Sequence, residues 1–212
     1  MSDNLNRRPL ETRKQAWPRA LAHVCVGLGI SPNQMSVASI GFAALGAAAY
    51  WGSAITEFPW RPILLVGAAV FIQARLLANM LDGLMAVEEG RKTPTGAIYN
   101  EFPDRIADAL FLVAAGYGGG APALGWAAAV LAVTTAYLRV LGGSLGFAQD
   151  FSGPMAKQHR MFVLTVASLL AACLPGLPVL AVALGVIILG CVATLVRRTR
   201  RLASNLRGRE HD

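Results

Sequence analysis

Apolar runs recur along the chain, and most are long enough to cross the roughly 30 Å hydrocarbon core of a bilayer. Short polar or Gly- and Pro-containing turns separate them. We predict six spans over residues 36–54, 63–85, 100–117, 123–147, 161–174 and 179–196, the last two being short. The fold class predicted is all-α, a polytopic membrane helical bundle that forms one domain over residues 1–212.

Composition and the chain ends agree with this class. The chain is 55% hydrophobic and 15% charged, whereas a soluble domain carries about 25% charge. Residues 1–35 read as a polar tail followed by a helix over 17–28, whose apolar stripe (Trp17, Leu21, Val24, Cys25 and Leu28) resembles a helix lying on the membrane interface. A cytosolic helix packed on the loops is the alternative. Residues 36–196 form the six-span core, and 197–212 form a basic tail.

The net charge of +7 does not indicate a nucleic-acid partner. Lys and Arg flank the apolar runs, where they meet lipid headgroups. They gather on the amino-terminal side, and the opposite side holds only Arg61. The positive-inside rule therefore predicts an integral protein of the cytoplasmic (inner) membrane with both termini and the 88–97 loop in the cytoplasm. The three scattered cysteines indicate neither a disulfide framework nor a zinc site.

Residues 79–108 carry carboxylates between these runs, and carboxylates at membrane depth usually mark a functional site. Oxygen-bearing side chains recur at helical spacing on two faces: Asn79 and Asp82 on one, and Asn100, Asp104 and Asp108 on the other. Gly83 and Gly96 leave bare backbone that a phosphate can approach. Such oxygen ligands suit a divalent cation and a pyrophosphate. The alternative is a polar network that only joins helices, although such contacts normally use Ser, Thr or Asn.

This stretch resembles the signature of the CDP-alcohol phosphatidyltransferase family, D-x2-D-G-x2-A-R-x8-G-x3-D-x3-D. The spacing is kept over all 26 positions, at Asn79, Asp82, Gly83, Ala86, Val87, Gly96, Asn100 and Asp104. Three letters depart from the signature: the first and third Asp are Asn79 and Asn100, and the Arg is Val87.

The resemblance implies an enzyme of phospholipid biosynthesis. It would transfer a phosphatidyl, or similar substituted phosphate, from a CDP-activated lipid such as CDP-diacylglycerol to a small polar alcohol, with release of CMP. It further implies that Asn79, Asp82, Asn100 and Asp104 hold Mg²⁺ or Mn²⁺, with Asp104 as the base. Substrate contacts are expected at Asn33, Gly83, Ala86, Gly96, Arg139, Lys157 and Arg160. A homodimer is implied as well.

The acceptor is not named by the sequence. The cations at Arg139, Lys157 and Arg160 suit an acceptor that bears a phosphate. Contact with lipid headgroups is the alternative for Lys157 and Arg160.

The departures from the signature change the charge of the site, because an Asn oxygen ligates a cation without balancing its charge. Arg75 lies one turn before Asn79 on the same face, and it could pair with Asp82 or Asp108 and make the loss of one metal ion tolerable. Glu88, Glu89 and Glu101 could replace the missing carboxylates, or they could simply be solvated. The alternative function is therefore a catalytically weakened relative that binds a nucleotide lipid, or assembles with other lipid enzymes, without turnover.

Overall fold

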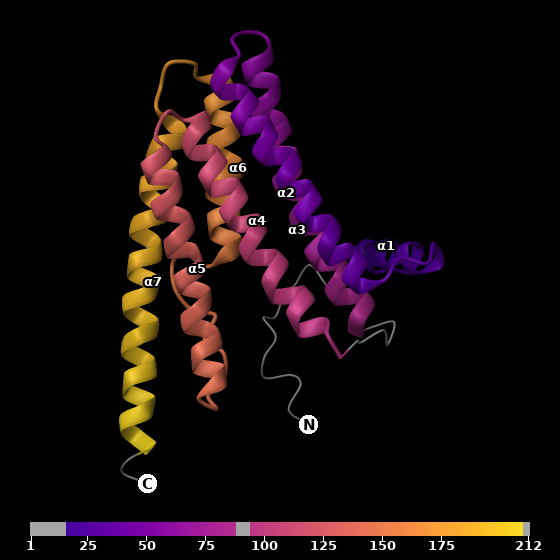
Figure 1. The fold of residues 1–212 in the computed structure, drawn as a ribbon, viewed down its shortest axis with the longest axis vertical. Helices are drawn as coiled ribbons and strands as arrows, with labels where there is room; N and C mark the ends of the chain where they lie inside the picture. Colours follow the sequence, from indigo (N-terminus) through magenta and orange to yellow (C-terminus); the bar gives the residue numbers. More distant parts are fainter. Residues whose placement is uncertain (1–15, 88–93, 210–212) are drawn as a thin grey trace.

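The computed structural model describes residues 16–87 and 94–209, and over these ranges the chain forms helices and no strands (Figure 1). The helices are α1 (Ala16–Gly27), α2 (Pro32–Ile55), α3 (Trp60–Val87), α4 (Gly96–Gly118), α5 (Pro122–Ser144), α6 (Lys157–Cys173) and α7 (Val179–Arg209). The predicted all-α class is confirmed, and each predicted span lies on its own helix.

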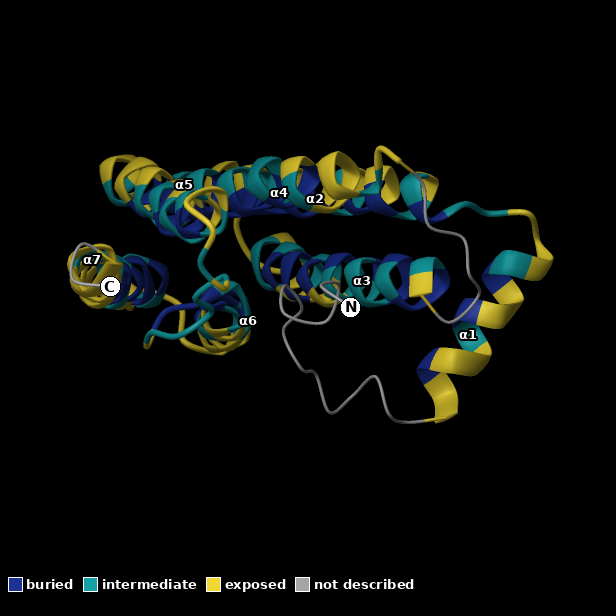
Figure 2. Cartoon of the chain, turned by 90° about the horizontal axis from the view of Figure 1, so that it is seen from below, coloured by how far each residue is buried: buried dark blue, intermediate teal, exposed yellow. Residues whose placement is uncertain are grey.

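The six long helices form two layers, seen end-on in Figure 2. One layer holds α5, α4 and α2 side by side, and the other holds α7, α6 and α3. Within the first layer α4 packs against both α2 and α5; between the layers α2 packs on α3 and α5 on α7. The helices that carry the motif, α3 and α4, therefore lie in different layers.

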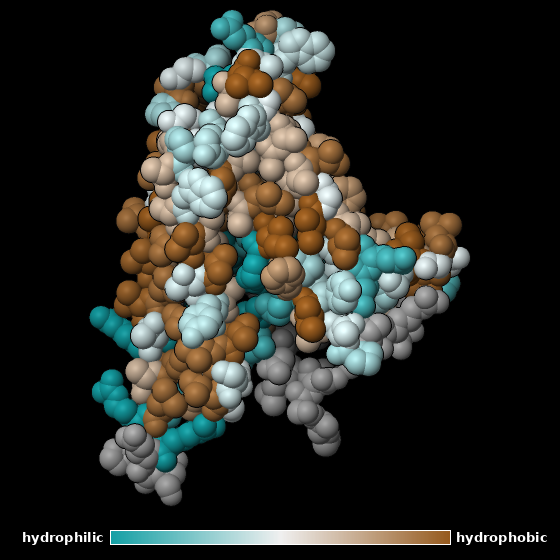
Figure 3. Space-filling model, in the orientation of Figure 1, coloured by the Kyte–Doolittle hydropathy of each residue, from teal (hydrophilic) through white to brown (hydrophobic). Residues whose placement is uncertain are grey.

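Four helices are long and apolar enough to cross a membrane by length and composition: α2, α3, α5 and α7. The other two belong to the same bundle. The first half of α4 carries several charged residues, and α6, with 17 residues, is about 26 Å long at 1.5 Å per residue. Figure 3 shows hydrophobic surface along most of the bundle's length. The chain is an integral membrane protein.

Two local features help to set the helices around the motif. Ser31 caps α2: its hydroxyl accepts from the Gln34 amide at 3.2 Å, while the Gln34 side chain accepts from the Ser31 amide at 2.8 Å. Farther along, α4 and α5 approach closely through Gly116 and Gly125. A Cβ on Gly116 would lie 2.8 Å from the Gly125 Cα, so only glycine allows this packing.

The basic tail predicted after residue 196 continues the helix of the last span. The helix continues to Arg209, because arginine is a good helix former and residues 197–207 contain neither Gly nor Pro. The extension also has partners: Arg198 Nε donates to the Ser152 carbonyl at 3.0 Å, and Arg201 lies 3.6 Å from Asp150. Burial acts to raise the pKa of Asp150, but hydrogen bonds from Ser152 and the nearby arginines outweigh it and hold the pKa below its usual range.

The helix predicted over 17–28 is confirmed as α1, which lies crosswise to the bundle beside α3 (Figures 1 and 2). Its buried face differs from the predicted stripe. Ala22 and Cys25 are buried in a cluster with Leu81 and Met85 of α3. The rest of the stripe is mostly exposed, including Trp17, Val24 and Leu28. The helix thus packs on α3 through small residues and keeps larger apolar side chains on its surface.

Candidate functional site

The two halves of the motif meet across the α3–α4 interface. Asn79 of α3 donates its side-chain amide to Asp104 Oδ1 of α4. These are the first and last polar positions of the signature, 25 residues apart in the chain. The helical spacing therefore does bring the two predicted faces together.

Arg75 lies at the centre of this interface and is fully buried, with 0% of its side chain exposed. Its Nη2 lies 2.8 Å from Asp108 Oδ1 and 3.2 Å from Asp104 Oδ1. The prediction that Arg75 pairs with Asp82 or Asp108 is confirmed for Asp108, and Asp104 is an additional partner.

The second oxygen of Asp104 is held from α6. Lys157 Nζ lies 2.6 Å from Asp104 Oδ2, and Arg105 lies 3.6 Å from the same oxygen. Both carboxylate oxygens of Asp104 are therefore engaged, one by Arg75 and Asn79 and the other by Lys157.

A second ion pair lies deeper, between α6 and α4. Arg160 Nη2 lies 2.7 Å from Asp108 Oδ2, and its Nη1 donates to the Met155 carbonyl at 3.0 Å. The same Nη1 lies 3.4 Å from the Thr135 hydroxyl of α5. With 2% of its side chain exposed, Arg160 is buried within the protein.

Asp82 lies apart from these ion pairs and has a hydroxyl partner. Ser36 Oγ lies 2.6 Å from Asp82 Oδ2 and 3.2 Å from the Pro32 carbonyl, so the start of α2 borders the site. Asn33, in the same turn, donates to Thr95 at 3.5 Å. Thr95 immediately precedes α4, so Asn33 lies where the loop between α3 and α4 returns.

A network of ion pairs around Glu101, in the first half of α4, was not foreseen from the sequence. Glu101 accepts from Arg139 of α5 and from Arg105 Nη2, the latter at 3.2 Å. Arg139 also donates to Gln149 at 2.6 Å and lies over the Phe151 ring at 5.1 Å. Glu101 is therefore ion-paired, not simply solvated. In the lower half of the face seen in Figure 3, hydrophilic residues lie among hydrophobic ones.

The remaining predicted positions lie around the ends of the motif helices. Gly83 and Ala86 are half-buried near the end of α3, Gly96 begins α4, and Asn100 is exposed one turn before Asp104. Glu88 and Glu89, which we considered as replacements for the missing carboxylates, lie outside the described residues.

The side chains present fit one divalent cation, bound at Asp82, better than two divalent cations of which one is bound at Asp104. Over residues 16–87 and 94–209, no three His, Cys, Asp or Glu side chains gather in a way that could hold a metal ion. Asp104 already has partners on both oxygens. Asp82 has one oxygen beside a neutral hydroxyl, and Asn79 can offer its carbonyl oxygen to a cation.

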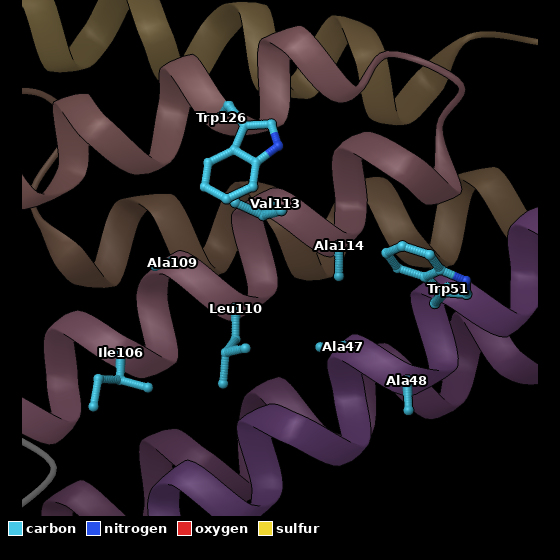
Figure 4. A pocket seen from close by; sticks show the side chains of 9 residues that line it. All are labelled: Ala47, Ala48, Trp51, Ile106, Ala109, Leu110, Val113, Ala114 and Trp126. Carbon is cyan, nitrogen blue, oxygen red and sulfur yellow. The ribbon is translucent and has the colours of Figure 1, made fainter.

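An apolar groove of about 530 Å³ lies elsewhere, between α2, α4 and α5 (Figure 4). Its α4 side consists of residues recurring at helical spacing: Ile106, Ala109, Leu110 and Val113. Asp104 and Asp108 project from another face of α4 and are buried. The groove is thus a feature of the bundle surface and is separate from the polar site.

Comparisons with known proteins show which enzymes the chain is similar to. No family model matches the chain. Phosphatidylinositol phosphate synthase of Mycolicibacterium smegmatis is 27% identical over 88% of this chain and 84% of that protein. The same enzyme of Streptomyces avermitilis is 26% identical over 80% of this chain and 71% of that protein.

Solved structures of Mycobacterium tuberculosis phosphatidylinositol phosphate synthase share the fold. The one with CDP-DAG bound has a TM-score of 0.66 at 21% identity, over 87% of this chain and 92% of that one. The one in complex with manganese and citrate has a TM-score of 0.67 at 21% identity, over 87% of this chain and 88% of that one. The chain is similar over most of its length to enzymes of the CDP-alcohol phosphatidyltransferase family. It differs from the family signature by amides at two of the carboxylate positions, Asn79 and Asn100.

Proposed function

We propose that this protein transfers a phosphatidyl, or similar substituted phosphate, group from a CDP-activated lipid to the hydroxyl of a small polar alcohol. The observation that carries this proposal is the contact between Asn79 and Asp104, which joins the two halves of the signature at the α3–α4 interface. CDP-diacylglycerol is the proposed donor, because a solved structure of similar fold holds CDP-DAG.

In the proposed reaction the acceptor oxygen forms a bond to the lipid-bearing phosphorus, and the bond from that phosphorus to the pyrophosphate bridging oxygen breaks. CMP leaves with that electron pair. The acceptor's hydroxyl proton passes to Asp104, and because both its oxygens are engaged, Lys157 must first release Oδ2; Oδ1 stays with Arg75 and Asn79. Lys157, with 25% of its side chain exposed, is the cation that an incoming acceptor can reach.

The nucleotide is proposed to lie at the ends of the motif helices. There Gly83, Ala86 and Gly96 offer small side chains or bare backbone, and Asn33 borders the same loop. A divalent cation, Mg²⁺ or Mn²⁺, supplies neutralisation of the pyrophosphate when bound. Asp82 and Asn79 are its proposed ligands. Asn100 is a further candidate because it is exposed on the same side of α4 as the loop.

On the acceptor side, Arg139, Lys157 and Arg160 remain the proposed cations. Their contacts in the structure differ in how far each side chain is left available to an acceptor. Lys157 is partly exposed, Arg139 is shared between Glu101 and Gln149, and Arg160 is buried against Asp108. We therefore assign direct acceptor contact to Lys157 and Arg139, and to Arg160 the role of positioning Asp108.

One observation favours the alternative function, a nucleotide-lipid-binding relative without turnover. Asp104, the proposed base, has a cation or amide on each oxygen. The deciding experiment incubates purified protein with CDP-diacylglycerol, Mg²⁺ or Mn²⁺ and a panel of serine, glycerol phosphate, inositol phosphate and an alcohol-bearing phospholipid. Mass spectrometry then identifies any new lipid. A new phospholipid with one acceptor supports transfer, whereas binding of the donor without product supports the alternative.

The proposed orientation places both termini and the 88–97 loop in the cytoplasm, where a nucleotide-linked donor is made. The proposed assembly is a homodimer. The groove in Figure 4, lined by small residues such as Ala47, Ala109 and Ala114, suits a helix of a second copy. Ala109→Trp should convert a dimer to a monomer in light scattering, whereas Leu189→Trp on the exposed face of α7 should not. A dimer that is unchanged in Ala109→Trp would exclude this groove as the interface.

A further inference from the structure

The carboxylates of the site are already balanced by cations of the protein itself. Three carboxylates (Asp82, Asp104 and Asp108) stand against three cations (Arg75, Lys157 and Arg160), all among the described residues. When Glu101 is added with the two arginines that contact it, the count becomes four carboxylates and five cations. Two divalent cations would add four positive charges to a site that is already neutral or positive.

Arg75 is a permanent part of this balance. A guanidinium stays charged in proteins, and this one is completely buried between α3 and α4. If it moved away from Asp104 and Asp108, its charge would be unpaired inside the bundle, which is costly at membrane depth. Arg75 therefore stays beside Asp104 regardless of what enters the site from the cytoplasm.

The unused hydrogen-bond donors of Arg75 point to the same conclusion. Among the described residues, its Nε and Nη1 are buried and have no hydrogen-bond partner. An anionic oxygen or a water molecule can accept from these groups, whereas a divalent cation cannot. The environment of Asp104 is therefore suited to anionic or neutral oxygen and unsuited to another cation.

We propose that Arg75 and Lys157 take the place of one divalent cation at Asp104. The site then holds a single divalent cation, at Asp82, and holds it only when a pyrophosphate supplies further negative charge. This inference rests on the proposed function for its choice of nucleotide. Asn79 is matched to the arrangement: as an amide it donates to Asp104 without adding a carboxylate that Arg75 would capture.

The test counts bound Mn²⁺ on the purified full-length protein by electron paramagnetic resonance of the free ion, with no acceptor present. Wild type should bind no Mn²⁺ at low micromolar concentration alone, and one Mn²⁺ per chain with CDP-diacylglycerol. Two Mn²⁺ per chain, or one without the nucleotide lipid, would overturn the proposal, and so would none with it. Because no turnover is measured, failure here is distinct from failure of the transferase assignment.

Variants test the role of Arg75 directly. Asn79→Asp with Asn100→Asp alone should raise Mn²⁺ affinity less than threefold, because the new carboxylate at position 79 lies at i,i+4 from Arg75. Adding Arg75→Leu should raise affinity at least tenfold and remove the need for the nucleotide. Adding Arg61→Leu instead, the same change at the far end of α3, should not. If the restored carboxylates tighten binding fully without Arg75→Leu, the proposal fails.

A second set of variants guards against misfolding, since Arg75→Leu removes a buried charge. Lys157→Gln changes a partly exposed cation on the other oxygen of Asp104 and, with the two restored carboxylates, should also raise Mn²⁺ affinity several-fold. Arg75→Lys should keep the wild-type count of one Mn²⁺. Elution as a single sharp peak in size-exclusion chromatography identifies the variants that have folded. Unchanged affinity in the folded Lys157→Gln combination would contradict the role of Lys157.

Discussion

Arg160 of α6 and Asp108 of α4 form an ion pair of 2.7 Å in which each side chain is only 2% exposed. Arg75 of α3 holds the other oxygen of Asp108 at 2.8 Å. One buried carboxylate thus ties together helices from both layers, directly beneath the proposed base Asp104.

Breaking this pair should destabilise the bundle. Arg160→Met leaves Asp108 with Arg75 alone, and removing one partner of a buried pair costs on the order of 3 kcal/mol. For a chain of this size that corresponds to a fall in Tm of roughly 6–12 °C. Thermal unfolding in detergent measures it.

The control pairs Arg160→Met with Asp108→Leu. Because that double variant leaves no carboxylate short of a partner on α4, it should lose less stability than the two single variants added together. Strict additivity would show that the pair has no coupling.

The contact between Gly116 and Gly125 gives a second prediction, independent of charge. Gly116→Ala forces a Cβ to 2.8 Å from the Gly125 Cα, and overpacking of this kind costs about 1–3 kcal/mol. Gly67→Ala is the matched control, since a Cβ there meets nothing within 4 Å. The expected result is a lower Tm for Gly116→Ala and an equal or higher Tm for Gly67→Ala. An equal change in Tm for the two variants would refute the close α4–α5 approach.

The membrane orientation is tested by single cysteines in a background lacking Cys25, Cys173 and Cys191. Cysteines at Ser2 and Glu89 should react with an impermeant thiol reagent only in inverted or permeabilised vesicles. A cysteine at Glu57 should react from outside intact spheroplasts. Labelling of Glu57 and Glu89 from the same side is incompatible with the proposed topology.

Features set by local sequence were predictable. The cap at Ser31 and Pro32, at the start of α2, is of this kind, because capping depends on residues within one turn. The apolar runs located the helices for the same reason. The predicted basic tail after residue 196 belongs to α7, and its helicity is supported by the contact of Arg198 with the distant Ser152, which the sequence does not reveal.

The spacing of the site residues along the chain was predictable from the sequence, but their ion-pair partners were not. The meeting of Asn79 and Asp104 followed from helical periodicity and the family signature. The partners of Glu101 and Arg160 did not, because Arg139 lies 38 residues from Glu101 and Asp108 lies 52 from Arg160. Such ion pairs depend on which helices pack together, and a single sequence does not specify that packing.

The assignment as a transferase is tested most directly by CMP release from CDP-diacylglycerol in the presence of the acceptor identified from the panel. Wild type should release CMP in equal amount to the new phospholipid, and EDTA should stop both. Asp82→Ala and Asp104→Ala should each lower CMP release at least a hundredfold while remaining folded in detergent, whereas Glu88→Ala and Glu89→Ala should have little effect. Activity that persists in Asp104→Ala would remove that residue from the role of base. CMP release by wild type no greater than by Asp104→Ala, with no new lipid, would contradict the transferase account.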